Sequence, residues 1–168
     1  MSLITLKTHD RYDYSPLPQR PDFAWPGGKR LSVAICNNIE VFSFRDGLGS
    51  DSAQVGAPQT SRNYAWRDYG NRVGQWYLFD LLDEMGLPAS HNFNSLLFDH
   101  CPAIADRMIA RGDEFIGHGR SNAERQDVLP PAEEEALIRE AYDAITAYTG
   151  KAPAGWLGPY LAQTDITL

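Results

Sequence analysis

Short apolar runs alternate with longer segments of helical periodicity along this chain. The runs at 31–36, 89–94, 114–117 and 154–160 have the length of strands, and the first is nearly continuous, as in a strand buried on both faces. Apolar positions three or four residues apart predict helices over 68–84, over 102–110 and from the turn after Pro131 to Gly150. Strands and helices in this alternation predict an α/β fold with a parallel sheet.

Glycine and proline mark where these helices end. Gly86 with Pro88, Gly112 and Gly150 follow the last periodic residue of each helix. The acidic run 133–135 lies in the first turn of the last helix, where negative charge complements the helix dipole. We expect this run to face water.

The remaining segments show neither the apolar runs of strands nor the spacing of helices. Residues 1–30 are polar, aromatic and rich in proline, which predicts an extended N-terminal arm. Residues 45–64 are rich in Gly, Ser, Asp and Gln and predict a long loop of the functional or mobile kind. Segment 163–168 resembles the start of another helix, capped by Thr164 or Asp165. Because four strands do not close a barrel, we expect 31–168 to form an incomplete barrel domain.

Charge and composition limit the class of partner. The net charge of −7 argues against nucleic acid and against anionic membranes, and no apolar run has the length of a membrane-spanning helix. Two cysteines, Cys36 in a core strand and Cys101 at a helix start, do not make a disulfide framework. With no secretory signal visible, the sequence predicts a cytoplasmic protein.

Two strand ends carry the candidate chemistry. The run 114–117 ends in Gly117-His118-Gly119, which presents an imidazole on a loop at the edge of the sheet, and Asn122 follows four residues later. The first strand leads into Glu40, a candidate general base. We predict that Glu40 and His118 converge across adjacent strand ends in a single pocket. The alternatives are a structural histidine and an ion pair of Glu40 with one of three arginines, Arg67, Arg72 or Arg120.

Asn122 and four further side chains are candidates for substrate binding. Asn38 precedes Glu40, and Arg72 opens the first predicted helix, where it can contact a polar substrate or remain a solvated surface arginine. Trp156 and Tyr160 can form an apolar wall for a ring or can pack in the core. His91 and His100 have no partner at an informative spacing.

Five segments in this order resemble the polysaccharide deacetylase family, the NodB-homology carbohydrate esterases. They are residues 20–28 (RPDFAWPGG), 38–40 (NIE), 69–74 (YGNRVG), 114–119 (EFIGHG) and 155–159 (GWLGP). The likeness is greatest to the branch that contains the metal-independent allantoinases. It implies an irregular (β/α) barrel of the NodB-homology type, with the active site at the carboxyl ends of the strands.

The family's functional positions transfer only in part. Its first motif carries two aspartates, whereas residues 37–40 here offer one carboxylate, Glu40. Its second motif is a pair of metal-binding histidines, here His118 and Asn122, and the arginine of its third motif is replaced by Leu157. Its later motifs would lie beyond residue 168. We therefore expect this chain to be truncated and inactive by itself, and to associate as a homo-oligomer that covers its open sheet edge.

These positions lead to a functional hypothesis with two open alternatives. Catalytic zinc takes three good ligands and a water, and the Asn122 amide is a poor third ligand beside Glu40 and His118. We therefore predict no metal, with zinc at these three residues as the alternative. The predicted activity is hydrolysis of a non-peptide carbon–nitrogen bond in a small amide, ureide or acetylated sugar, with Glu40 as base and His118 stabilising the oxyanion. The other alternative is a non-catalytic family member that binds a sugar or ureide or supports an assembly.

Overall fold

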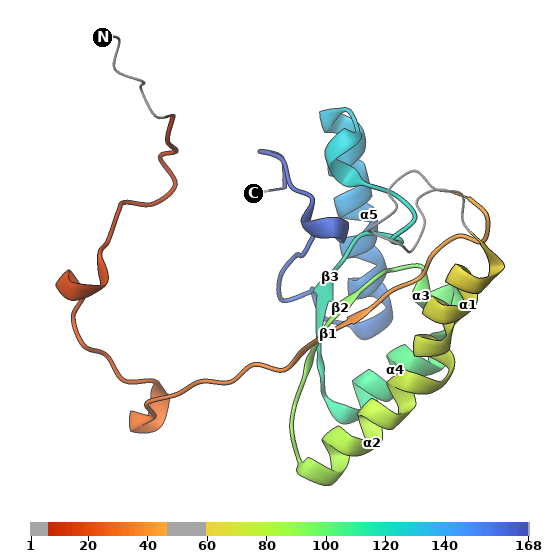
Figure 1. The fold of residues 1–168 in the computed structure, drawn as a ribbon, viewed down its shortest axis with the longest axis horizontal. Helices are drawn as coiled ribbons and strands as arrows, with labels where there is room; N and C mark the ends of the chain where they lie inside the picture. Colours follow the sequence, from red (N-terminus) through yellow and green to blue (C-terminus); the bar gives the residue numbers. More distant parts are fainter. Residues whose placement is uncertain (1–6, 47–59, 168) are drawn as a thin grey trace. The chain divides into compact units, whose positions relative to one another are not determined.

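The structure, a computed structural model, describes residues 7–46 and 60–167. The chain divides into two units, residues 1–33 and 34–168. Figure 1 traces both along the sequence. In the first unit, the described residues are extended apart from two 3-10 turns, Leu17–Gln19 and Pro26–Gly28, and none of them is buried.

The second unit is built on a parallel sheet. Its strands are β1 (Cys36–Ile39), β2 (Ser90–Phe93) and β3 (Glu114–Gly117), in that spatial order. Ile39 pairs with Phe93 and Phe93 with Gly117, so the three strands end at one level. The predicted α/β fold with a parallel sheet is confirmed.

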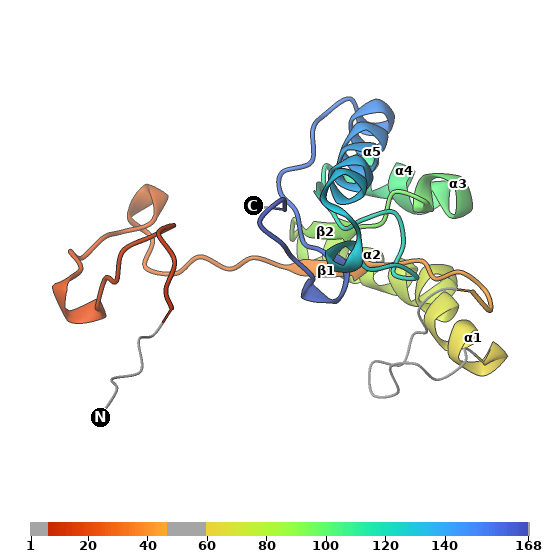
Figure 2. The same ribbon diagram turned by 90° about the horizontal axis from the view of Figure 1, so that it is seen from above.

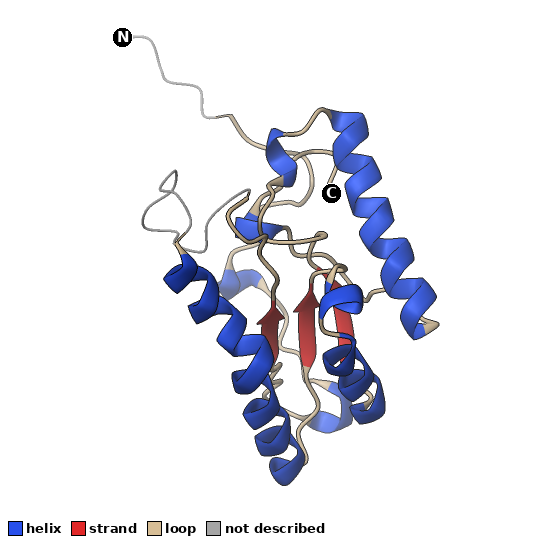
Figure 3. Ribbon diagram, turned by 90° about the vertical axis from the view of Figure 1, so that its right-hand side faces the viewer, coloured by secondary structure: helices blue, strands red, loops and turns tan. Residues whose placement is uncertain are grey.

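Helices cover the sheet, as Figures 2 and 3 show from two sides. They are α1 (Ser61–Tyr69), a π-helical segment (Gly70–Gly74), α2 (Gln75–Met85), α3 (Leu97–His100), α4 (Pro102–Arg111) and α5 (Pro131–Thr149). The first three form one continuous helical stretch. It begins earlier than predicted because Thr60 caps it, with its side-chain oxygen accepting from the amide of Asn63 at 3.1 Å. Residues 47–59 of the predicted loop lie outside the described residues.

The core lies between one face of the sheet and these helices. Ile39, Phe93 and Phe115 point from the three strands toward α2, α4 and α5, where Phe79, Met108 and Ile145 are fully buried. Alternate strand residues such as Cys36 and Asn38 point to the other face and are exposed. The prediction of a first strand buried on both faces, with Cys36 in the core, is therefore wrong.

Three predicted elements also differ in extent. The strand expected over 31–36 begins only at Cys36, and Leu31 is exposed. The strand expected over 154–160 is a single bridge between Gly117 and Trp156, after which the chain turns into a 3-10 segment, Pro159–Leu161. Residues 165–167 form a turn and not a helix. In each case the length of the element depends on whether its backbone finds a hydrogen-bonding partner, and not on local hydrophobicity.

One of the three acidic residues at the start of α5 is buried. Glu134 is only 1% exposed, and its carboxylate accepts hydrogen bonds from Gln126 at 3.0 Å, Thr164 at 2.6 Å and Thr167 at 2.7 Å. These bonds attach the C-terminal described segment to α5. The prediction that residues 133–135 all face water is wrong for this residue.

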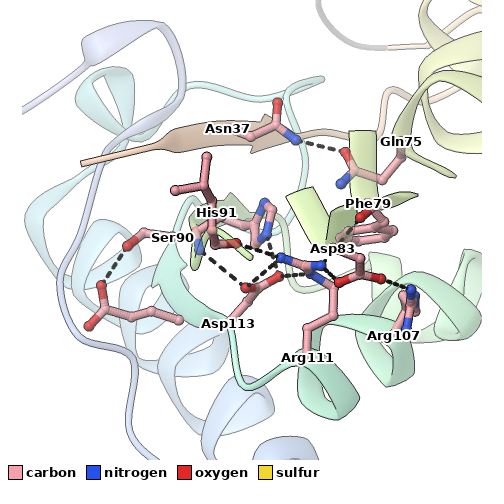
Figure 4. A network of polar contacts seen from close by, with 12 residues as sticks. Asn37, Gln75, Phe79, Asp83, Ser90, His91, Arg107, Arg111 and Asp113 are labelled. Atoms are coloured by element: carbon pink, nitrogen blue, oxygen red, sulfur yellow. Dashed lines mark hydrogen bonds and ion pairs between the residues drawn. The ribbon is translucent and has the colours of Figure 1, made fainter. Parts of the chain in front are cut away.

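A buried polar network lies at the opposite end of the sheet from the carboxyl ends of the strands (Figure 4). His91 Nε2 lies 3.1 Å from Asp113 Oδ2, which also accepts from Arg111 Nε at 2.7 Å. Arg111 donates to the carbonyl of Leu87 at 3.0 Å and pairs with Asp83. His91 therefore has a buried partner that its sequence spacing does not reveal.

No helix in the described ranges has the length and apolar character to cross a bilayer.

Candidate functional site

Each strand of the sheet delivers one polar side chain directly after its last residue. These are Glu40 after β1, Asn94 after β2 and His118 after β3. Because the three strands end in register, the three residues are neighbours at the carboxyl edge of the sheet. Parallel α/β proteins place ligand sites at this edge.

The structure brings Glu40 and His118 together. Oε1 of Glu40 lies 3.3 Å from Nε2 of His118, and the two side chains are 18% and 3% exposed. On the other side of the ring, Nδ1 of His118 contacts the carbonyl oxygen of Leu157. A carbonyl can only accept a hydrogen bond, so Nδ1 carries a hydrogen. Nε2 of the same ring faces the Glu40 carboxylate.

Several contacts keep the Glu40 carboxylate ionised. Burial raises its pKa, but the hydrogen bond and positive charge of His118, the charge of Arg67 and a hydrogen bond from Asn122 outweigh burial and leave the pKa below its ordinary value. Arg67 Nη1 lies 3.7 Å from Oε2 of Glu40. Glu40 therefore makes both an ion pair with an arginine and a contact with His118, which the sequence left as alternatives.

A buried amide fixes the orientation of Asn122. The backbone amide of Val41 donates to Oδ1 of Asn94 at 2.9 Å, so Nδ2 of Asn94 is the end that donates to the carbonyl of His118 and, at 3.0 Å, to Oδ1 of Asn122. Both asparagines are buried. With its oxygen engaged, Asn122 turns its amide nitrogen toward Glu40, where it donates a hydrogen bond.

This orientation decides whether the three residues fit a metal. Asn122 presents N–H hydrogens and not an oxygen to the centre, and Nδ1 of His118 is engaged with the carbonyl of Leu157. Zinc sites take their ligands mainly from cysteine, histidine and acidic side chains. No group of three such side chains gathers in the part of the chain that the structure describes. The alternative of zinc at Glu40, His118 and Asn122 therefore does not fit the geometry.

Three hollows adjoin at Glu40, and each is also bordered by Phe42 and Arg67. Their volumes are about 450, 250 and 180 Å³. We call the first the large hollow and the last the small hollow. The large hollow extends toward α1 and the start of α4, whereas the small hollow contains His118. The small hollow is also lined by Asn38, Asn122, Leu157, Tyr160 and Leu161.

Besides Asn122, two of the predicted substrate-binding residues lie in the small hollow. Asn38 donates to Oε1 of Glu40 at 3.3 Å and accepts from Asn92 at 2.6 Å. Tyr160 donates its hydroxyl to the carbonyl of Asn122 at 2.8 Å. Its backbone is in the left-handed region, with φ of 59°, which is rare for a residue with a side chain.

The other two lie elsewhere. Arg72 borders the large hollow, but its side chain is 73% exposed and pairs with Asp68. Trp156 lines neither the large nor the small hollow. Its ring packs on Gly117, where a side chain would collide with it, and its indole N–H donates to Gln126 at 3.1 Å. Trp156 is therefore a packing residue and not a wall of this site.

The sequence interpretation missed Asn94 and Asn71 as parts of the site and named Arg67 only as one of three possible ion-pair partners of Glu40. Asn94 follows β2 as Glu40 follows β1, so the strand-end rule that selected Glu40 and His118 selects it too. Asn71 donates to the backbone carbonyl of Glu40 at 2.7 Å. Arg67 was treated as a loop residue because the helix was expected to begin at residue 68.

Fold and site together define a parallel α/β protein with a carboxylate and an imidazole at the carboxyl ends of its strands. The sequence profile of the family described as polysaccharide deacetylase matches residues 64–168. The chain therefore belongs to the polysaccharide deacetylase family, as its motifs predict. Among curated proteins, none matches the chain in sequence.

Solved structures share the fold. The PuuE allantoinase superposes with a TM-score of 0.70 at 23% identity, over 86% of this chain and 53% of that protein. A probable polysaccharide deacetylase from Pseudomonas aeruginosa PAO1 gives 0.68 at 25% identity, over 79% and 48%. A CE4 family pseudoenzyme from Bacillus anthracis gives 0.53 at 14% identity, over 58% and 34%. The chain thus matches part of the NodB-type barrel and spans about half the length of the first two structures.

Proposed function

We propose that this chain carries a hydrolase site for a non-peptide carbon–nitrogen bond in a small ureide or acetylated sugar. The observation that carries the proposal is the 3.3 Å contact between the Glu40 carboxylate and the His118 imidazole at the carboxyl edge of the sheet. Membership of the polysaccharide deacetylase family and the likeness in fold to a protein named an allantoinase support it.

The reaction uses the two side chains in opposite roles. A substrate carbonyl in the small hollow lies beside His118, and its oxygen shares the Nε2–H with Oε1 of Glu40 as negative charge develops on it. Glu40 takes a proton from water as the water oxygen bonds to the carbonyl carbon. When the carbon–nitrogen bond breaks, the leaving nitrogen takes that proton from Glu40. The products are a carboxylic acid and an amine, and Glu40 is again ionised.

A second candidate function is ligand binding without catalysis. The carboxylate of Glu40 already accepts from Asn38 and Asn122 and contacts the side chains of His118 and Arg67. These contacts lower its pKa, and a carboxylate with a low pKa is a weak base. The same polar groups remain able to hold the amide edges of a ureide or an acetamido group.

Turnover separates the two candidates. The wild-type chain, Glu40→Gln and Glu135→Gln are each incubated with allantoin and with acetylated chito-oligosaccharides, and allantoin consumption and acetate release are measured. Glu135 is a matched control because it is an exposed acidic residue on α5 paired with Arg139. The sequence alone predicts an inactive chain, but the structure brings the Glu40 carboxylate and the His118 imidazole together. We therefore expect turnover of one substrate, a loss on the order of 100-fold in Glu40→Gln, the contribution typical of a general base, and no loss in the control.

The remaining outcomes are equally informative. Saturable binding without turnover, measured by calorimetry and abolished by Glu40→Gln, supports the binding function and refutes the hydrolase. Neither turnover nor binding with any of these compounds refutes both. Equal loss in Glu40→Gln and Glu135→Gln refutes the assignment of the site.

A further inference from the structure

Helix α1 and the π-helical segment hold Glu40 at two points. Asn71 donates to its backbone carbonyl at 2.7 Å, and Arg67 approaches its carboxylate at 3.7 Å. Arg67 and Asn71 are four residues apart, so they lie on the same face of the helix. One helical face therefore contacts both the backbone and the side chain of a single strand-end residue.

The π-helical segment extends this contact. It spans Gly70–Gly74 and joins α1 to α2, where Gln75 is buried and accepts from the side chain of Asn37 at 2.7 Å. A π-turn shifts the phase of the residues that follow it, and such turns occur mostly at functional sites. Here residues on both sides of the π-turn contact the strand that leads to Glu40, and the ends of β1 and α1 are thereby held together.

Aromatic rings hold the guanidinium of Arg67. Its central carbon lies 5.1 Å from the ring centre of Phe42 and 5.3 Å from that of Trp66. Cation–π contacts at these distances stabilise the charged group and restrict its orientation. Trp66 is largely exposed, so its contact with a cation gives this surface aromatic a specific use.

The two oxygens of Glu40 have different partners. Oε1 lies 3.3 Å from His118 Nε2 and 3.3 Å from Asn38 Nδ2, whereas Oε2 faces Arg67. A carboxylate held from both sides cannot rotate without losing one contact.

We propose that Arg67 is a positioning residue, which fixes the Glu40 carboxylate against His118 from α1. Its part in catalysis rests on the proposed hydrolase function, but its hold on the Glu40–His118 pair does not. Without the guanidinium, the carboxylate loses its ion pair at Oε2 and turns toward the hollows. The hydrogen bond to His118 then weakens.

The matched variants are Arg67→Met, Arg67→Gln, Arg67→Lys and the control Arg72→Met. Arg72 lies in the same helical stretch and borders the same large hollow, but it pairs with Asp68 and does not contact Glu40. The chain is labelled with ¹⁵N in its histidines, and the ring-nitrogen signals of His118 are recorded by NMR at neutral pH. Loss of these signals in His118→Asn assigns them.

We expect the Nε2 signal of His118 to shift in Arg67→Met and Arg67→Gln, to shift less in Arg67→Lys, and to stay unchanged in Arg72→Met. If the wild type turns over a substrate, kcat falls on the order of 100-fold in Arg67→Met, as for a misplacement of about 1 Å, while KM changes little. Circular dichroism checks that each variant folds. If Arg67→Met does not fold, Arg67→Gln takes its place in both the NMR and the kinetic measurement.

Two results overturn the proposal. An unchanged His118 signal in folded Arg67→Met or Arg67→Gln shows that Arg67 does not hold the pair. A shift of equal size in Arg72→Met shows a general effect of charge. Absence of turnover in the wild type, with the expected NMR shifts, refutes the hydrolase but leaves the positioning role intact.

Discussion

Replacement of Asn94 by alanine tests whether this buried amide organises the site. The side chain is fully buried and makes three hydrogen bonds, one from the backbone of Val41, one to the carbonyl of His118 and one to the side chain of Asn122. Each lost hydrogen bond costs about 1 kcal/mol. We therefore expect Asn94→Ala to lower the free energy of unfolding by about 3 kcal/mol, which in a chain of this size lowers Tm by roughly 6–12 °C.

Asn92 in the same strand provides the matched control. It is also buried, but its amide donates only to Asn38 at 2.6 Å and, weakly, to the sulfur of Cys36. We expect Asn92→Ala to cost about 1 kcal/mol. Urea unfolding followed by circular dichroism measures both variants. Equal costs for the two would refute the three-bond role of Asn94.

Asn94→Asp separates the loss of packing from the loss of hydrogen-bond direction. Aspartate has the same shape and still accepts from Val41, but it places an oxygen against the carbonyl of His118 and Oδ1 of Asn122. Asn122 relieves the second contact only by rotating its amide, which ends its hydrogen bond to Glu40. We expect this variant to lose the ligand binding or turnover of the wild type. Wild-type function in a folded Asn94→Asp would contradict the argument on amide orientation.

Three further predictions concern stability. Gly158→Ala places a methyl group on the backbone oxygen of Ala162, which cannot move as a side chain can, so we expect a loss of about 2 kcal/mol in thermal unfolding; an unchanged Tm would show that this turn adapts. Phe79→Ala empties a fully buried position and is expected to cost about 4 kcal/mol in urea unfolding, and a cost below about 1 kcal/mol would contradict its place in the core. Burial lowers the pKa of His91, although its hydrogen bond to Asp113 and the charge of Asp113 act in the opposite direction. Because the unfolded chain then binds this proton more readily, stability is fully present above about pH 6.5 and falls as the pH decreases below it. Unfolding of the wild type and of His91→Gln at about pH 7.5 and 5.5 measures this, and equal pH dependence in both would refute it.

The sequence predicts the helices and the order of elements well because their signals are local. The strand 114–117 and the ends of the helices at Gly86, Gly112 and Gly150 are found as predicted. Each of these three glycines has a positive φ, which other residues adopt at a cost. Such constraints depend on a few neighbouring residues and are therefore visible without a structure.

Errors occur where a distant partner decides. Residues 31–35 have the apolar composition of a strand, but it is residues 36–39 that pair with β2. The side-chain amides of Asn37 and Asn38 in this strand find partners in Gln75 and Asn92. The burial of Glu134 depends on Thr164 and Thr167, about thirty residues away. In the site, Glu40 and His118 follow from the rule that parallel strands end at one edge. Arg67 depends on the packing of α1, which no local pattern encodes.

Hydrolysis and simple binding differ in what they require of one atom, Oε2 of Glu40. Protonation of Oε1 weakens its hydrogen bond with His118, because an ionised acceptor makes the stronger bond. Oε2 lies 3.7 Å from Arg67, beyond ordinary hydrogen-bond distance, and we assign it the role of proton acceptor. Catalysis thus needs Arg67 close enough to orient the carboxylate yet too far to occupy Oε2 completely. A binding protein has no such requirement, since a closer pair at Oε2 would leave its amide contacts to a ligand unchanged.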